Sequence, residues 1–157
     1  MINRILFVCL GNICRSPAAE GIFLHLICEK GLADKFFVDS AGTGGWHAGS
    51  PPDHRMLAAA ERRGIHLPSL ARKIQPSDLR DFDMIITMDS RNTSAVQSMA
   101  AMYPGELNLP SVELITTYAR NFQELDIPDP YYGGPRGFEY VLDLLEDSCG
   151  GLLESLA

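Results

Sequence analysis

The stretch RILFVCLGNICRSP, residues 4–17, decides the fold. Its first part, residues 4–8, is a short and mostly apolar run, which is typical of a strand buried in a parallel sheet. Gly11 and Asn12 tolerate the unusual backbone of a tight turn. Ser16 suits the N-cap of a helix and Pro17 its first residue. The stretch therefore predicts a strand, a tight loop and a helix in direct succession.

The rest of the chain continues this alternation. Further strands are expected at residues 36–38, 84–88 and 112–114, and further helices at 53–63, 90–102 and 138–145. Strands that alternate with helices predict an α/β fold, with a parallel sheet, helices on both faces and ligands beyond the carboxyl ends of the strands. An anion-binding loop directly after the first strand would lie at that edge.

Composition limits the classes of function. A chain of 157 residues with 46% hydrophobic content is expected to form one compact domain over residues 1–157. Its net charge of -7 disfavours nucleic acid and anionic membranes as partners, since both attract clustered Lys and Arg. The N-terminal apolar run is too short for a signal peptide or a membrane span, which favours a cytoplasmic location. Four cysteines are too few for a disulfide scaffold, so free thiols are expected.

The loop of residues 9–15 carries the chemistry. Five residues separate Cys9 from Arg15, a spacing that lets backbone N–H groups curl around a tetrahedral oxyanion. Loop amides, the helix N-terminus and Arg15 all favour the thiolate form of Cys9, which is the nucleophile. Arg15 can also form two parallel hydrogen bonds to a phosphate group. These features predict a phosphate-ester enzyme. The residues expected to surround the anion are Leu10, Gly11, Asn12, Ile13, Cys14 and Ser16.

Residues 9–16 and the stretch DPYYG at 129–133 together resemble the low-molecular-weight protein tyrosine phosphatases, and the resemblance extends over essentially the whole chain. It implies a four-stranded parallel sheet flanked by helices. It also implies hydrolysis of phosphotyrosine in protein substrates, with Cys9 as nucleophile, Arg15 as phosphate clamp and no cofactor. Phosphate and other oxyanions are then expected to compete with substrate, and the protein is expected to be a monomer.

Asp129 is the candidate general acid. Displacement of a tyrosine phenolate is easier when a positioned acid protonates the departing oxygen. Pro130 favours an extended backbone at Asp129, which suits a carboxyl group held on a loop over the site. The resemblance implies that the same carboxylate later takes a proton from the attacking water. Asp126 is a weaker candidate, because it lacks the following proline and the family match.

Aromatic and aliphatic side chains are expected to form the walls of the site. Tyr131, Tyr132 and Trp46 can flank a flat ring, and Ile13 supplies an aliphatic face. Trp46 can equally be a packing residue, as aromatic residues often are. Relatives that act on phosphoarginine tend to carry Thr at the position of Ile13 and to lack the tyrosine pair, so these residues favour phosphotyrosine.

Two further residues are expected to support the loop. The resemblance implies that Ser40 helps to hold it through hydrogen bonds and that Asp89 orients the arginine. Asp89 is also a good N-cap for the helix that follows it. This chain has Ser69 where many relatives carry His, which predicts a changed hydrogen-bond network around Asn12.

Cys14 shares the tight loop with Cys9, and two thiols this close can come within disulfide reach. The resemblance implies a redox role, in which a bridge between them protects the nucleophile from over-oxidation. The alternative is that Cys14 is a small buried packing residue.

Three other functions are alternatives. A thiol-dependent arsenate reductase has a similar loop but needs additional cysteines to relay a disulfide, and residues 87–118 contain none. The other two are a protein-arginine phosphatase and a phosphotyrosine-binding module without turnover, and intact Cys9, Arg15 and Asp129 argue against the module. The four histidines lack paired metal-ligand spacing, so no metal site is expected.

Overall fold

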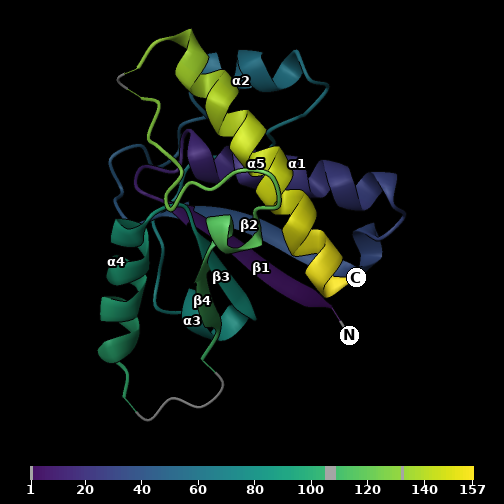
Figure 1. Ribbon diagram of the computed structural model, residues 1–157. Coiled ribbons are helices and arrows are strands. Elements are labelled where there is room, and N and C mark those ends of the chain that lie inside the picture. Colours follow the sequence, from purple (N-terminus) through teal and green to yellow (C-terminus); the bar gives the residue numbers. More distant parts are fainter. Residues whose placement is uncertain (1, 105–108, 132) are drawn as a thin grey trace.

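Four parallel strands form one sheet in the computed structural model, which describes residues 2–104, 109–131 and 133–157 (Figure 1). The strands are β1 (Asn3–Cys9), β2 (Phe36–Gly42), β3 (Met84–Thr87) and β4 (Ser111–Leu114). Their order across the sheet is β2-β1-β3-β4, and each neighbouring pair is parallel. The predicted α/β class and the four-stranded parallel sheet are therefore confirmed.

Helices alternate with the strands along the chain, as the pattern predicted. They are α1 (Arg15–Glu29), α2 (His54–Glu61), α3 (Asp78–Asp81), α4 (Ser90–Ala101) and α5 (Pro135–Leu156), with 3-10 turns η1 (Ala33–Lys35) and η2 (Ile115–Tyr118). Both η2 and α5 follow the last strand. The side chain of Asp53 caps α2 by accepting a hydrogen bond from the N–H of Arg55. Gly64, which follows α2, has a φ of 75°, a conformation that favours glycine.

The start of α1 differs from the sequence prediction. The helix begins at Arg15 with Cys14 in the N-cap position, rather than after Ser16. The hydroxyl of Ser16 lies 2.9 Å from the sulfur of Cys9 instead of capping the helix. The contact with the preceding loop therefore replaces the expected N-cap role of Ser16.

Helix α5 is longer than its predicted core of residues 138–145. It continues to Leu156, because Cys149, Leu152 and Leu153 extend its buried face well past Leu145. Despite this length, neither α5 nor any other helix of the described residues is long and apolar enough to cross a membrane.

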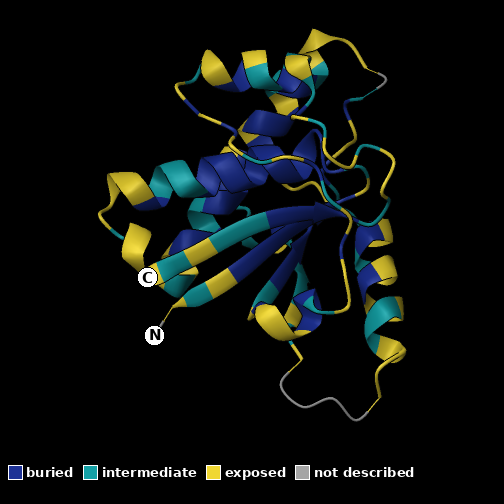
Figure 2. Cartoon of the chain, turned by 180° about the vertical axis from the view of Figure 1, so that it is seen from behind, coloured by how far each residue is buried: buried dark blue, intermediate teal, exposed yellow. Residues whose placement is uncertain are grey.

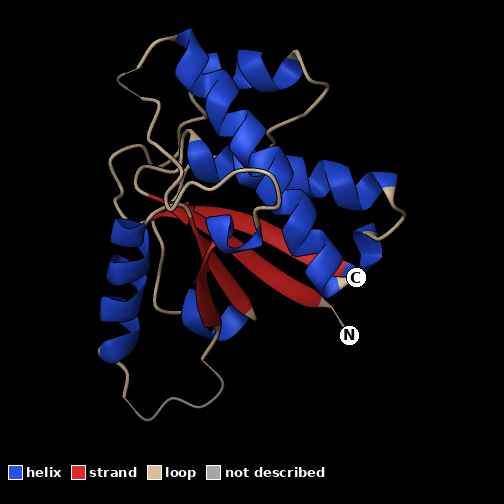
Figure 3. Cartoon of the chain, in the orientation of Figure 1, coloured by secondary structure: helices blue, strands red, loops and turns tan. Residues whose placement is uncertain are grey.

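Helices cover both faces of the sheet (Figure 3). Ile5 and Phe7 of β1 belong to a core shared with α1, α2 and α5, whereas Leu6 and Val8 belong to a second core with α3 and α4. Successive side chains of a strand point to opposite faces, so β1 is buried on both sides, which explains its continuous apolar run. Burial is deepest toward the carboxyl ends of the strands (Figure 2).

The carboxyl ends of β1, β2 and β3 lead into the loops that build the site. The N–H of Thr43 donates to the carbonyl of Cys9 at 2.9 Å, and the N–H of Met88 donates to the carbonyl of Val8 at 3.1 Å. Three segments that are distant in sequence are thus fastened together around the end of β1.

Candidate active site

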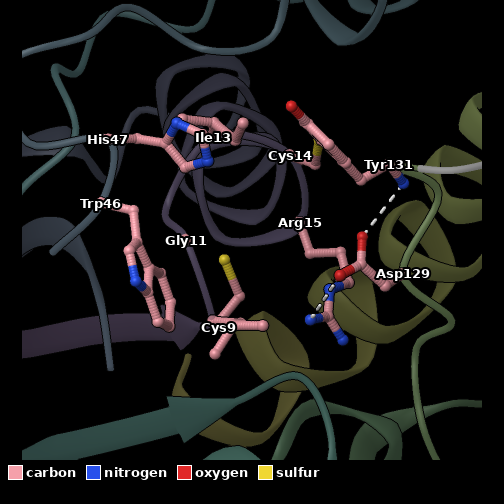
Figure 4. Close-up of a pocket in the computed structure, with 10 residues that line it drawn as sticks. Cys9, Gly11, Ile13, Cys14, Arg15, Trp46, His47, Asp129 and Tyr131 are labelled. Atoms are coloured by element: carbon pink, nitrogen blue, oxygen red, sulfur yellow. Dashed lines mark hydrogen bonds and ion pairs between the residues drawn. The ribbon is translucent and has the colours of Figure 1, made fainter. Parts of the chain in front are cut away.

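Cys9 ends β1, and its sulfur lies at the floor of the loop that leads into α1 (Figure 4). The residue is 3% exposed. The backbone N–H of Asn12 donates to the sulfur at 3.2 Å, and the hydroxyl of Ser16 lies 2.9 Å from it. Asn12 has a φ of 59°, the left-handed conformation that asparagine tolerates. The loop thereby presents a backbone amide and a hydroxyl to the same sulfur atom.

The side chain of Asn12 joins the loop to two neighbouring segments. Its Nδ2 donates to Ser16 Oγ at 2.8 Å and to Ser40 Oγ at 3.0 Å, and its Oδ1 accepts from the backbone N–H of Arg72 at 3.0 Å. Ser16 Oγ therefore contacts both the Asn12 amide and the sulfur of Cys9, and its hydroxyl can donate to that sulfur when the sulfur is a thiolate. The expected role of Ser40 as a partner of this loop matches these contacts.

Glu20, on α1, extends this network and was missed from the sequence. Ser40 Oγ donates to Glu20 Oε1 at 2.6 Å, and Ser69 Oγ lies 3.5 Å from Ser40 Oγ. Glu20 is 5% exposed, and burial raises the pKa of its carboxyl group although hydrogen bonds from Ser40 and Ser69 oppose this shift. The only sequence signal was a carboxylate on the apolar, buried face of α1.

Arg15 is held from two sides at the start of α1. Its Nη1 donates to Asp89 Oδ2 at 2.6 Å and to the carbonyl of Ile127 at 2.9 Å. Its Nη2 lies 3.6 Å from Asp129 Oδ2. Burial disfavours the charge on Arg15, but Cys9 and the two carboxylates outweigh burial and raise its pKa. The guanidinium is thus fixed, charged and 3% exposed.

Asp89 makes the contacts expected for both of its predicted roles, partner of Arg15 and N-cap of the helix that follows. Its Oδ2 accepts from Arg15, and its Oδ1 accepts from the backbone N–H of Asn92 at 2.8 Å. The side chain of Asn92 reaches back to the N–H of Asp89, which completes a capping box at the start of α4. One carboxylate therefore both caps a helix and pairs with the buried arginine.

Asp129 reaches the site from the loop before α5. Its side chain is 41% exposed, and its Oδ1 accepts a hydrogen bond from the N–H of Tyr131 at 3.0 Å. Asp126, the weaker candidate acid, accepts instead from the backbone N–H and hydroxyl of Ser90. Asp129 lines the same cavity as Cys9 and Arg15 (Figure 4), and Asp126 is not among the residues that line it.

This cavity has a volume of about 400 Å³. The residues that line it are Cys9, Leu10, Gly11, Ile13, Cys14, Arg15, Trp46, His47, Asp129 and Tyr131. Of the other predicted site residues, Asn12, Ser16, Ser40 and Asp89 lie behind the lining, where they contact Cys9, Arg15 or one another. Tyr132 lies outside the described residues.

His47 lines the cavity and was not selected from the sequence. Its ring centroid lies 6.1 Å from that of Tyr131. A β-carbon at Gly11 would lie 3.0 Å from His47 Cδ2, so glycine permits this close approach without needing a positive φ. His47 directly follows Trp46, and this neighbour was the signal that could have identified it.

Trp46 stands on the opposite wall from Asp129 and is 72% exposed. Such exposure shows that Trp46 is not a core residue. A β-carbon at Gly44 would overlap its indole ring, so a glycine at this position allows the ring to lie where it does. Tyr131 lines the cavity as well, and the guanidinium of Arg55 lies 5.5 Å from its ring centroid.

Cys14 is buried and lines the cavity beside Cys9. Burial and the nearby carboxylate of Asp53 raise the pKa of the Cys14 thiol. No group of three or more His, Cys, Asp or Glu side chains in the described ranges is arranged to hold a metal ion.

The chain resembles known proteins along nearly its whole length. YfkJ of Bacillus subtilis, a low molecular weight protein-tyrosine-phosphatase, is 45% identical over 153 residues, which cover 97% of this chain and 94% of the relative. The crystal structure of a protein tyrosine phosphatase from Entamoeba histolytica superimposes with a TM-score of 0.92 and 38% identity, covering 98% of this chain and 96% of that one. The Drosophila arginine phosphatase DARP superimposes with a TM-score of 0.90 and 34% identity, covering 97% and 96%.

The family comparison agrees with these likenesses and with the predicted resemblance. Residues 4–157 match the family described as low molecular weight phosphotyrosine protein phosphatase. The match includes the loop from Cys9 to Arg15 and the segment that carries Asp129. The chain therefore belongs to the low molecular weight phosphotyrosine protein phosphatase family.

Proposed function

We propose that this protein hydrolyses phosphotyrosine monoesters of protein substrates, with Cys9 as nucleophile, Arg15 as phosphate clamp and Asp129 as general acid. The observation that carries the proposal is that a buried sulfur, a buried guanidinium and a half-exposed carboxyl group line one cavity. A nucleophile, an anion-binding group and a proton donor are the parts that transfer of a phosphoryl group to a thiol requires.

In the first step the sulfur of Cys9 attacks phosphorus, and the bond from phosphorus to the tyrosine oxygen breaks. Backbone N–H groups of the loop other than that of Asn12, which donates to the sulfur, and the guanidinium of Arg15 hold the phosphoryl oxygens as their charge redistributes. The hydroxyl of Ser16, 2.9 Å from the sulfur, stabilises the thiolate before attack and again when the sulfur leaves. A water molecule then attacks the cysteinyl-phosphate and releases inorganic phosphate.

Asp129 gives its proton to the departing phenolate oxygen and later takes a proton from the attacking water. Its contact with Arg15, at 3.6 Å, is longer than a hydrogen bond and partly exposed to solvent. General acid catalysis of this kind contributes about a hundredfold to ten-thousandfold in rate.

The walls of the cavity support an aryl substrate. Trp46 and Tyr131 offer aromatic surfaces, and Ile13 offers an aliphatic one. We propose that these side chains flank the tyrosine ring of a phosphotyrosine residue. Phosphoarginine is the second candidate substrate, because the DARP fold resembles this one. Guanidinium groups also stack on aromatic faces, so the discriminating residue is Ile13, which stands where relatives that act on phosphoarginine tend to carry Thr and which favours the aryl ring.

We also propose that Cys14 acts as a redox partner of Cys9. Both thiols line the cavity from the same loop. Peroxide would oxidise the Cys9 thiolate to a sulfenic acid, and the Cys14 thiol would displace water from it to form a disulfide. A thiol reductant would then restore both cysteines.

Phosphate release from a phosphotyrosine peptide and from a matched phosphoarginine peptide tests the proposed activity. We expect release from the first peptide, loss of that release in Cys9→Ser, and a phosphorylated Cys9 when Asp129→Ala reacts with p-nitrophenyl phosphate and is quenched with denaturant at alkaline pH. The variant Cys28→Ser is the matched control, because Cys28 is exposed and lies on the far part of α1. Binding of the peptide without release of phosphate would leave a binding module, and faster release from phosphoarginine would change the substrate assignment.

A further inference from the structure

Asp126 lies on the loop that carries Asp129 but points to a different partner. Its Oδ1 accepts two hydrogen bonds from Ser90, one from the backbone N–H at 3.0 Å and one from the hydroxyl at 2.9 Å. Ser90 is the first residue of α4, so the carboxylate of Asp126 sits at the positive end of that helix. The contact joins residues 125–129, here called the acid loop, to the segment that follows β3, where Asp89 accepts a hydrogen bond from Arg15.

The neighbours of Asp126 are fastened to the same region. The N–H of Ile127 donates to the carbonyl of Met88 at 2.8 Å, and the carbonyl of Ile127 accepts from Arg15 at 2.9 Å. On the other side, the hydroxyl of Thr116 donates to the carbonyl of Leu125 at 2.7 Å. Residues 125–127 are thus held at three successive positions, and the chain becomes exposed at residues 128 and 129.

We propose that Asp126, through its two hydrogen bonds to Ser90, is a positioning residue: it sets the distance between the carboxyl group of Asp129 and the sulfur of Cys9. This proposal rests on the assignment of Asp129 as the general acid. Two adjacent residues then position the phosphate-binding arginine and the general acid. Asp89 pairs with Arg15, and Ser90 donates hydrogen bonds to the acid loop. Because both contacts start from the N-terminus of α4, they hold Arg15 and Asp129 at a constant separation.

This arrangement also explains why Asp126 does not serve as the acid itself. Its hydrogen-bonding oxygen is engaged by Ser90 outside the cavity, and Asp126 does not line the cavity. A shift of the acid loop by about 1 Å is enough to lower the rate of a positioned group substantially. Asp126 therefore acts on the proton transfer only through the position of Asp129.

The test compares two substrates that differ in their need for an acid. Phenyl phosphate has a poor leaving group, and p-nitrophenyl phosphate has a good one that departs with little protonation. We expect Asp126→Ala to lower kcat/KM, which reports only the steps up to departure of the phenol, by about tenfold or more for phenyl phosphate and by less than about threefold for p-nitrophenyl phosphate. Inhibition by inorganic phosphate should stay unchanged, because the loop of residues 9–15 is intact.

Further variants separate positioning from loss of structure. Asp126→Asn keeps an acceptor oxygen and should restore most of the phenyl phosphate activity, whereas Ser90→Ala removes only the hydroxyl bond and should show a smaller selective loss. Asp81→Ala, an exposed aspartate on α3, is the matched control and should match the wild type on both substrates. Equal losses of kcat/KM on the two substrates, or wild-type kcat/KM for phenyl phosphate in Asp126→Ala, would overturn the proposal.

Asp129→Ala, measured in the same series, distinguishes failure of this proposal from failure of the proposed function. If Asp129→Ala shows the selective loss and Asp126→Ala does not, the positioning role is wrong and the acid assignment stands. If Asp129→Ala lowers kcat/KM equally for both substrates, the acid assignment is wrong and the positioning role is wrong with it.

Discussion

Asp89 pairs with Arg15 through one carboxylate oxygen and caps α4 through the other. The N-terminus of a helix on one face of the sheet is thereby joined to the N-terminus of α1 on the other face. Any change at Asp89 affects two properties of the protein, the stability of α4 and the orientation of the guanidinium, and the choice of substitution separates them.

The first prediction concerns Asp89→Asn and Asp89→Ala. Asparagine caps helices as well as aspartate does, whereas loss of the cap costs about 1 kcal/mol. We therefore expect Asp89→Ala to be less stable than Asp89→Asn by about that amount in urea unfolding. Both variants remove the charge that pairs with Arg15, so both should lower kcat/KM for aryl phosphates by about tenfold to a hundredfold. Wild-type kcat/KM in Asp89→Asn would contradict the orienting role.

The second prediction concerns the Trp46 wall. A β-carbon in Gly44→Ala would overlap the indole ring, and since Trp46 is exposed the ring should swing away while the fold remains. Loss of one aromatic contact should raise KM for phosphotyrosine peptides about threefold to tenfold. Inhibition by inorganic phosphate, which does not need the wall, should be unchanged.

Gly45→Ala is the matched control for Gly44→Ala. Its added β-carbon would lie 3.5 Å from Lys73 Cδ, an ordinary van der Waals contact, so its KM should equal that of the wild type. If Gly44→Ala also keeps the wild-type KM, Trp46 does not contact the substrate.

The third prediction concerns the two cavity thiols. Burial raises the pKa of Cys14, so this thiol stays protonated at neutral pH and iodoacetamide should label Cys9 first. After peroxide treatment, a thiol reductant should restore wild-type activity, because a Cys9–Cys14 disulfide is reversible. Cys14→Ser should lose activity irreversibly, with sulfinic Cys9 visible by mass spectrometry. Cys28→Ser serves as the control, and full recovery of Cys14→Ser would contradict the redox role.

The fourth prediction concerns Glu20 and pH. Burial raises the pKa of Glu20 in the folded protein above its unfolded value of about 4.3, so the folded state binds the proton more tightly. Stability linked to this proton is present below the unfolded pKa and is lost as pH rises through the folded pKa. Glu20→Gln lacks this loss, so its stability relative to the wild type should increase with pH and then level off.

Urea unfolding of both proteins between pH 4 and pH 8 measures this difference. Glu61→Gln, an exposed glutamate on α2, is the control and should track the wild type at every pH. A Glu20→Gln variant that becomes relatively less stable as pH rises would show that Glu20 is stabilised as a carboxylate.

Local sequence was sufficient to predict the loop of residues 9–15 and the alternation of the four strands with the four longer helices, but not the short helix α3. These features depend on short runs of residue types: a buried apolar run, a turn that allowed Asn12 its left-handed φ, and helical periodicity. The start of α1 was harder to predict, because the hydroxyl of Ser16 could either cap the helix or contact the sulfur of Cys9. Only the folded loop shows which contact is made.

Contacts between distant segments were not predictable from local patterns. Nothing in the local pattern distinguishes Glu20 from an ordinary helical residue. Its partner Ser40 lies beside it only because β1 pairs with β2 in the folded protein. The bond from Ser90 to Asp126 spans the interval between β3 and the acid loop in the same way. Spacing in sequence identified the reacting groups, and the tertiary fold was needed to identify the residues that hold them.

The surfaces that surround the cavity come from separate stretches of chain. The sulfur and guanidinium belong to residues 9–15, the indole and imidazole walls to residues 44–47, and the carboxyl group to residues 125–129. Grafting a different 44–47 segment onto this scaffold should therefore retarget the enzyme to another class of phosphate ester without disturbing the reacting groups. Substrate preference can thus change through residues 44–47 while the reacting groups of residues 9–15 stay the same.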